Sequence, residues 1–319
     1  MRLFIIVLLI VCGLAIDSFF DADRSYPISE ALTFRLSDLE IPNGYTLLLE
    51  CFLKESQTPE KLSITLITDL TLAKGDIPLQ IYPHPTQSEN ILFALIGIPY
   101  NSTATHDSIL VEWTESDRVF AQELSFKIIA GPYRSEQIKG VPQNRVTPSA
   151  SDYQRISRER KMIARAYEPI QATTTMANTF SDPVDKRTIT SPYGTRRLFN
   201  GQLRSYHGGL DLRAYEGTPI KAAQAGIVKL AQNLFYAGNH VLLEHGMGIH
   251  TGYSHMSKLY VKKGDRVNQG QILGLSGSTG RVTAAHLHWT VNVNGVGVSP
   301  LQFTEILDKL YRKPVEPIR

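Results

Sequence analysis

Cysteine is nearly absent from this sequence, which contains two cysteines in 319 residues. Cys12 lies in an apolar leader, and removal of that leader would leave Cys51 with no partner in the same chain. This excludes an intrachain disulfide framework in the processed protein, so an exported form must be held together by its hydrophobic cores. Cys51 lies in the apolar run YTLLLECFL, where we expect a buried small hydrophobic side chain rather than a nucleophile.

Excess charge of one sign is also lacking. The net charge is only +3 and no long Lys/Arg run occurs, so nucleic-acid binding is not indicated. The pattern G-x-x-x-x-G-K-[ST] is missing, which excludes a phosphate-binding loop of that type. With 42% hydrophobic and 20% charged residues the chain can build ordinary globular cores, and its length allows about two domains.

Long hydrophobic runs are missing except at the start. Arg2 is followed by the apolar run LFIIVLLIV, and Gly13 and Ala15 provide the small side chains that a signal peptidase requires. The run is shorter than the roughly 20 apolar residues that span a bilayer, so we expect a signal peptide over residues 1–15. A retained membrane anchor is the alternative. A lipoprotein at Cys12 is disfavoured by the bulky Val11. The processed protein is then soluble and exported, with no stable transmembrane span.

Five segments are expected along the chain. They are the signal peptide 1–15, a β-sandwich domain 24–132, a linker with a helix 133–177, a β domain 178–305, and a C-terminal helix and tail 306–319. Seven short strand-like runs separated by turn residues predict the sandwich, which we assign as immunoglobulin-like. These runs are ALTFRLS, YTLLLECFL, KLSITLI, IPLQIYP, NILFALIGI, SILVEWT and LSFKIIA.

The linker is predicted to contain a basic helix, SDYQRISRERKMIARAYEP. Ser151 or Asp152 would cap this helix and Pro169 would end it, with Ile156 and Ile163 on one face. One interpretation is a solvated helix whose apolar stripe packs on a neighbour. The other is an element that positions or covers an active site.

The last part of the chain is rich in glycine and again strand-like. Asn294-Gly295 between VNV and VGV predicts a two-residue hairpin turn. Ser299-Pro300 predicts the start of the final helix, with serine as the cap and proline in the first helical position.

Seven of the nine histidines fall between residues 207 and 288. His286 and His288 are two residues apart on a predicted strand, so both imidazoles should face one side of the sheet. His207 and Asp211 flank Gly208-Gly209, which permits a bend into a strand at Leu210. Two imidazoles and one carboxylate could bind zinc and leave a coordination position open, as catalytic zinc sites do. Spacing alone leaves open which histidines are the ligands.

Residues 189–300 contain six characteristic segments, which are SPYGTRR, YHGGLDL, GTPIKAAQAGIV, GNHVLLEHGMGIHTGYSHM, VKKGDRVNQGQILGLSGSTGRVT and HLHW. In these segments the chain resembles the lysostaphin/LytM-type zinc metallopeptidases, which cut peptide bonds in peptidoglycan. The resemblance implies a mainly antiparallel β domain like the duplicated hybrid motif.

The resemblance also implies roles for five side chains. His207, Asp211 and His288 would bind Zn²⁺, and His255 and His286 would be catalytic. The chain carries Thr283-Ala284-Ala285 before His286, where many relatives have Gly-Pro. This difference puts the positioning of His286 in question, because the backbone before it is less restricted.

We therefore expect a zinc endopeptidase that acts on peptidoglycan stem peptides and cross-bridges in the periplasm or cell envelope. The main rival is a non-enzymatic envelope-binding regulator that activates a separate wall amidase, and a secreted protease acting on proteins is a third option. The regulators typically lack some site residues, whereas all five are present here. The N-terminal domain could bind the wall, bind a partner, or contact and shield the active site.

Other polar residues near these motifs have simpler interpretations. We expect His245 to fix a turn, and His240 and His250 to occupy exposed strand positions. Arg196, Arg197 and Arg281 are expected on the surface, with contact to peptide carboxylates of the wall polymer as the alternative.

Overall fold

The computed structural model describes residues 25–27, 32–53, 61–67, 77–85, 90–115, 117–138, 148–168, 178–199 and 202–312. The predicted signal peptide, with Cys12, and Pro169 lie outside the described residues. None of the helices in the described ranges is long and apolar enough to cross a membrane.

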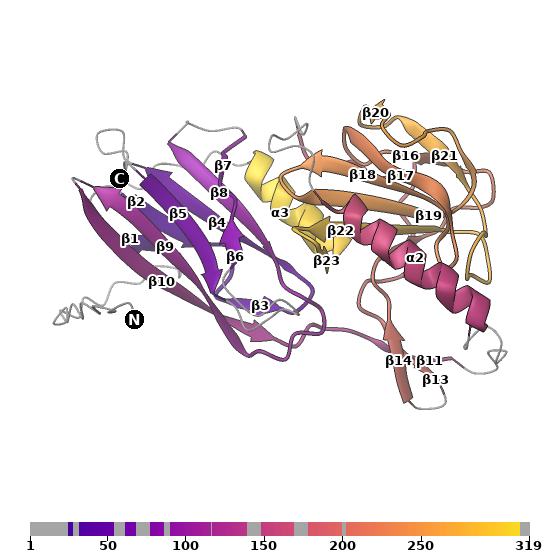
Figure 1. The fold of residues 1–319 in the computed structure, drawn as a ribbon, viewed down its shortest axis with the longest axis horizontal. Coiled ribbons are helices and arrows are strands. Elements are labelled where there is room, and N and C mark those ends of the chain that lie inside the picture. The colour runs from indigo at the N-terminus through magenta and orange to yellow at the C-terminus, as the bar shows by residue number, and fades with distance from the viewer. Residues whose placement is uncertain are drawn as a thin grey trace.

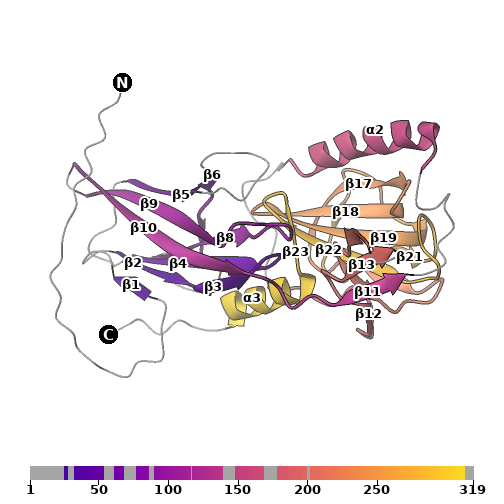
Figure 2. The same ribbon diagram turned by 90° about the horizontal axis from the view of Figure 1, so that it is seen from below.

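The chain is mainly β, as predicted, and forms two β-rich domains that lie side by side (Figures 1 and 2). Helix α3 (Pro300–Arg312) lies between them, and helix α2 (Ala150–Ala166) lies along the outside of the C-terminal domain.

The N-terminal domain consists of two five-stranded sheets around one hydrophobic core. The first sheet has the order β1 (Ser25–Pro27), β2 (Leu32–Leu36), β4 (Thr46–Leu53), β8 (Ile91–Gly97) and β7 (Tyr82–Pro83). The second has the order β3 (Glu40–Pro42), β10 (Arg118–Ile129), β9 (His106–Glu115), β5 (Lys61–Ile67) and β6 (Ile77–Leu79). All seven predicted runs form strands, and IPLQIYP is divided between β6 and β7. The immunoglobulin-like assignment remains a prediction.

Both faces of strand β4 are buried, and most of its side chains are apolar. Leu47, Leu49 and Cys51 point into the core between the two sheets. Leu48 points the other way and joins the core of the C-terminal domain. Burial raises the pKa of the Cys51 thiol to about 12, which agrees with an inert, buried side chain.

The N-cap of the linker helix lies two residues before the first of the two predicted caps. Ser149, not Ser151 or Asp152, is the N-cap, because its side chain accepts from the Asp152 backbone N–H while the Asp152 carboxylate accepts from the Ser149 N–H. Ile156 is buried as expected, and Ile163 packs against a cluster containing Leu230. The helix is therefore packed through its apolar stripe, as the first interpretation proposed.

The linker also contains a strand that the sequence did not predict. Strand β11 (Ser135–Ile138) pairs in parallel with β13 (Arg196–Phe199), which forms a hairpin with β14 (Gln202–Tyr206). The linker is thus joined to the segment that leads into His207.

A ten-stranded sheet forms the body of the C-terminal domain. Its main path has the order β12 (Ile189–Ser191), β15 (Leu210–Leu212), β22 (Leu287–Val293), β19 (Ile249–Leu259), β18 (Gly238–Gly246), β17 (Gly226–Leu234) and β20 (Arg266–Val267). Off this path, β21 (Ile272–Ser276) pairs with β16 (Pro219–Lys221) and β19, and β23 (Val296–Val298) pairs with β22. The predicted hairpin turn is present, with φ of 49° at Asn294 and 83° at Gly295.

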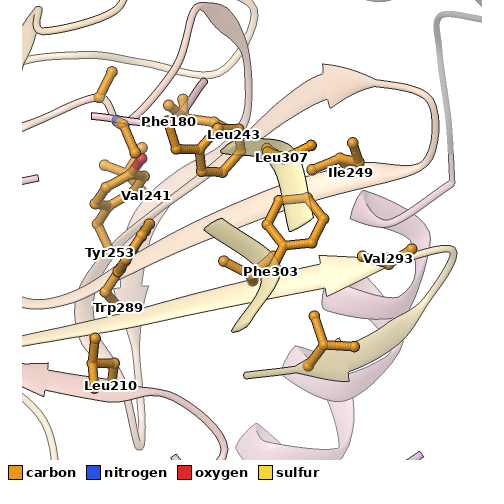
Figure 3. Close-up of a cluster of buried hydrophobic side chains, with 14 of the residues drawn as sticks. Phe180, Leu210, Val241, Leu243, Ile249, Tyr253, Trp289, Val293, Phe303 and Leu307 are labelled. Atoms are coloured by element: carbon orange, nitrogen blue, oxygen red, sulfur yellow. The ribbon is translucent and has the colours of Figure 1, made fainter. Parts of the chain in front are cut away.

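One core joins the sheet, helix α3 and the N-terminal domain. Figure 3 shows Trp289 and Tyr253 beside one another on the sheet and Phe303 of α3 against it. Phe93 of the N-terminal domain belongs to the same buried cluster. Across the domain boundary, Gln302 exchanges two hydrogen bonds with the Thr46 backbone, of 2.8 and 2.9 Å. Helix α3 begins at Pro300 after Ser299, as predicted.

Candidate metal centre

Three chain segments bring His207, Asp211 and His288 together. His207 follows β14, Asp211 is in β15, and His288 is directly opposite Asp211 in the β15–β22 register. Gly209 makes the bend between the first two possible, because a Cβ there would lie 2.8 Å from Nε2 of His288 and 2.6 Å from the Trp289 carbonyl oxygen. The structure therefore brings together the residues that the two sequence motifs singled out.

The ligand atoms of these residues point at one another. Asp211 Oδ1 lies 2.9 Å from His207 Nε2 and 2.8 Å from His288 Nδ1, and the two nitrogens are 3.0 Å apart. Nδ1 of His207 donates a hydrogen bond of 2.9 Å to the Pro192 carbonyl, which leaves Nε2 as the free lone pair. Among the described residues, these three form a group that could hold a metal ion.

The electrostatics of Asp211 favour its charged form. Burial acts to raise the pKa of the carboxyl, but the hydrogen bonds and charges of His207 and His288 outweigh it and hold the pKa well below its usual range. The ionised carboxylate is the form in which an aspartate side chain binds metals.

His255 and His286 lie close to this group. Their ring centroids are 5.0 Å apart, and His255 is 5.8 Å from the His288 ring. His286 Nε2 is 3.6 Å from Asp211 Oδ1, and its Nδ1 donates to the Ala284 carbonyl at 2.9 Å. Ala284 is one of the three residues that stand where many relatives have Gly-Pro, and its carbonyl is the acceptor that orients the His286 ring.

His255 has an uncommon backbone conformation and is held in place by hydrogen bonds. It has a φ of 64°, an uncommon conformation for a residue with a side chain. Its N–H donates to the Ala237 carbonyl at 2.8 Å and its Nδ1 to the Thr279 carbonyl at 2.9 Å. Burial is the main cause that lowers the pKa of His255 to about 4, so the ring is neutral at neutral pH.

Some neighbouring residues differ from expectation. His250 is 1% exposed rather than on the surface, because Tyr167 of the segment after α2 covers it edge-on at 5.2 Å. Arg197 is not simply a surface residue, since its Nη2 lies 3.9 Å from Asp211 Oδ2. His245 hydrogen-bonds to the Ala225 carbonyl, in agreement with a structural role. Arg281 lies over the Tyr236 ring.

Residues 205–300 match the family described as Peptidase family M23. The peptidoglycan DD-endopeptidase ShyA of Vibrio cholerae is 43% identical over 122 residues, which cover 38% of this chain and 28% of that protein. The DD-carboxypeptidase/endopeptidase Mpg of Neisseria meningitidis is 34% identical over 120 residues, again 38% of this chain and 28% of that protein.

A solved structure resembles more of the chain. A Pseudomonas aeruginosa protein assigned provisionally to peptidase M23 superposes with a TM-score of 0.58 at 25% identity, over 82% of this chain and 94% of that chain. The C-terminal domain thus contains a peptidase M23 domain, which confirms the resemblance recognised in the sequence. The matched part spans less than a third of the length of the two curated relatives.

Proposed function

We propose that this chain is an exported, zinc-dependent endopeptidase that hydrolyses the peptide cross-links of peptidoglycan. The observation that carries the proposal is the convergence of His207, Asp211 and His288, with His255 and His286 close beside them. The relatives named as peptidoglycan DD-endopeptidases support the substrate class.

The three proposed ligands fit zinc in type and spacing. Two imidazole nitrogens and one carboxylate oxygen are a common catalytic zinc set, and bonds of 2.0–2.1 Å would separate tetrahedral ligands by about 3.4 Å. The donor atoms here are 2.8–3.0 Å apart, so small side-chain rotations suffice. When bound, zinc supplies Lewis-acid chemistry that lowers the pKa of water from 15.7 to about 7.

The two further histidines would handle protons. Nδ1 of both rings donates to a backbone carbonyl, so Nε2 of His255 and of His286 carries the free lone pair. One Nε2 can take a proton from the attacking water as its oxygen adds to the peptide carbonyl carbon. The same ring, now positive, can stabilise the developing oxyanion and give the proton to the leaving amine as the C–N bond breaks.

The apolar leader and the relatives support a location in the cell envelope or periplasm. The rival function, a regulator that activates a separate amidase, is disfavoured because no member of the five-residue set is missing.

Digestion of purified peptidoglycan by the full processed chain, followed by mass spectrometry of the fragments, tests the proposal. We expect cross-linked peptides to be cut, activity to be lost on chelation, and activity to return with zinc. If stem peptides are released intact, and only when a separate amidase is added to the digestion, the result would favour the regulator. Intact cross-links after digestion with zinc-loaded protein would refute the endopeptidase proposal.

A further inference from the structure

Four tyrosines connect the N-terminal domain to the segment that supports His207. Tyr100 follows β8, Tyr133 follows β10, Tyr193 lies before β13, and Tyr206 ends β14 directly before His207. The Tyr100 ring stacks on Tyr206 with centroids 3.8 Å apart and is 4.7 Å from Tyr133. Tyr193 meets Tyr100 and Tyr133 edge-on at 6.1 and 6.0 Å. The contact between the domains therefore extends to a proposed metal ligand.

A chain of hydrogen bonds runs through the same place. The Tyr100 hydroxyl donates to the Gly194 carbonyl at 2.9 Å, and the Gly194 N–H donates to the His207 carbonyl at 2.7 Å. The His207 N–H donates to the Thr195 carbonyl at 2.9 Å, and its ring Nδ1 to the Pro192 carbonyl at 2.9 Å. Residues 192–195 thus fix both the backbone and the ring of His207, and Tyr100 bonds to the middle of that segment.

Packing leaves this segment little room to move. Gly194 has a φ of 78°, and a Cβ there would collide with the Tyr133 ring. Gly44 of the N-terminal domain has a φ of 82°, and a Cβ there would lie 2.8 Å from the Tyr193 ring. The Tyr133 hydroxyl donates to the Asn43 carbonyl. Glycine is therefore required at Gly194 and Gly44, where the backbone packs directly against a tyrosine ring.

We infer that Tyr100 is a positioning residue for the metal site: through Gly194 it holds the 192–195 segment, and thereby aims His207 Nε2 at Asp211 and His288. The inference rests on the proposed zinc site. The N-terminal domain then helps to hold His207 in place, although it contributes no proposed metal ligand itself.

The expected effect is on zinc affinity. Partners that hydrogen-bond directly to metal ligands typically change affinity by about 10–100-fold when removed. Tyr100 acts one hydrogen bond further away, so loss of its hydroxyl should weaken zinc binding by about three- to tenfold.

The test compares Tyr100→Phe with Tyr82→Phe in the full chain. Tyr82 is a matched control, because its hydroxyl donates to Gln80 Oε1 at 2.6 Å in its own domain and its ring packs near Phe93. Zinc affinity is measured by competition with a chromophoric chelator, and the thermal midpoint of each metal-free protein is recorded. We expect weaker zinc binding in Tyr100→Phe alone.

Equal zinc affinity in Tyr100→Phe and the unchanged chain would overturn the inference, as would equal losses in both variants, which would indicate a general effect on stability. A lower thermal midpoint for Tyr100→Phe without a change in zinc affinity would assign the residue a structural role only. Because the assay uses no wall substrate, a chain that binds zinc but cuts no cross-links would refute the proposed function and leave the inference standing. A chain that takes up no zinc would refute both.

Discussion

Replacement of His250 by leucine should make the protein less sensitive to acid. His250 is 1% exposed, and burial outweighs the interactions with Glu244 and the Gly248 backbone that favour its protonated form. Burial, as the largest cause, lowers the pKa of His250 to about 4, against about 6.5 for an exposed histidine. The unfolded chain therefore binds this proton more readily than the folded chain, and stability is lost as the pH falls below about 6.5.

The size of this loss follows from the two pKa values. At pH 5 a group with pKa values of about 4 folded and 6.5 unfolded costs about 2 kcal/mol, and at pH 7.5 it costs almost nothing. Leucine has a similar volume and no polar atom to bury, so His250→Leu should leave the free energy of unfolding at pH 7.5 close to that of the unchanged chain. Its loss between pH 7.5 and pH 5 should be about 2 kcal/mol smaller than that of the unchanged chain.

Urea unfolding at a series of pH values, followed by circular dichroism, measures this difference. His245→Leu is a less suitable variant, because it removes the hydrogen bonds of His245 to the Ala225 carbonyl and to Thr251 Oγ1. Parallel stability curves for His250→Leu and the unchanged chain would show that the pKa of the buried imidazole is not lowered in the folded protein.

Three further changes separate catalysis, metal binding and folding. His286→Ala should retain about one zinc per chain and lose about 10²–10⁴-fold in hydrolysis rate, as measured on labelled cross-linked peptides; loss of zinc would instead make His286 a ligand. Gly238→Ala should lower the hydrolysis rate and leave zinc content unchanged, because Gly238 has a φ of 62° and a Cβ there would collide with Thr279, whose carbonyl orients His255; an unchanged rate would show that Thr279 does not depend on this contact. Phe303→Ala should lower the free energy of unfolding by about 3–5 kcal/mol in urea titrations, since Phe303 is fully buried in the core that joins the two domains; a cost below 1 kcal/mol would contradict that packing.

Local patterns in the sequence predicted the parts of the site that depend on local geometry. Alternation along a strand places His286 and His288 on one face, and the Gly208-Gly209 bend brings His207 to Asp211. The cap of α2 was misplaced because the segment SASD offers several capping residues, and the reciprocal Ser149–Asp152 bonds decide between them.

Long-range contacts could not be predicted in this way. The Tyr100–Gly194 hydrogen bond joins residues 94 positions apart, and nothing in either local sequence specifies the other. The parallel pairing of β11 with β13 is of the same kind. His250 looked like an exposed strand residue because its cover, Tyr167, comes from the linker rather than from its own sheet.

The zinc content of the folded full chain, compared with that of His288→Ala by elemental analysis, tests the central claim most directly. We expect about one zinc per chain in the unchanged protein and almost none in the variant, because His288 Nδ1 is one of only three proposed ligands. A folded chain that takes up no zinc, or a variant that keeps it, would contradict the account.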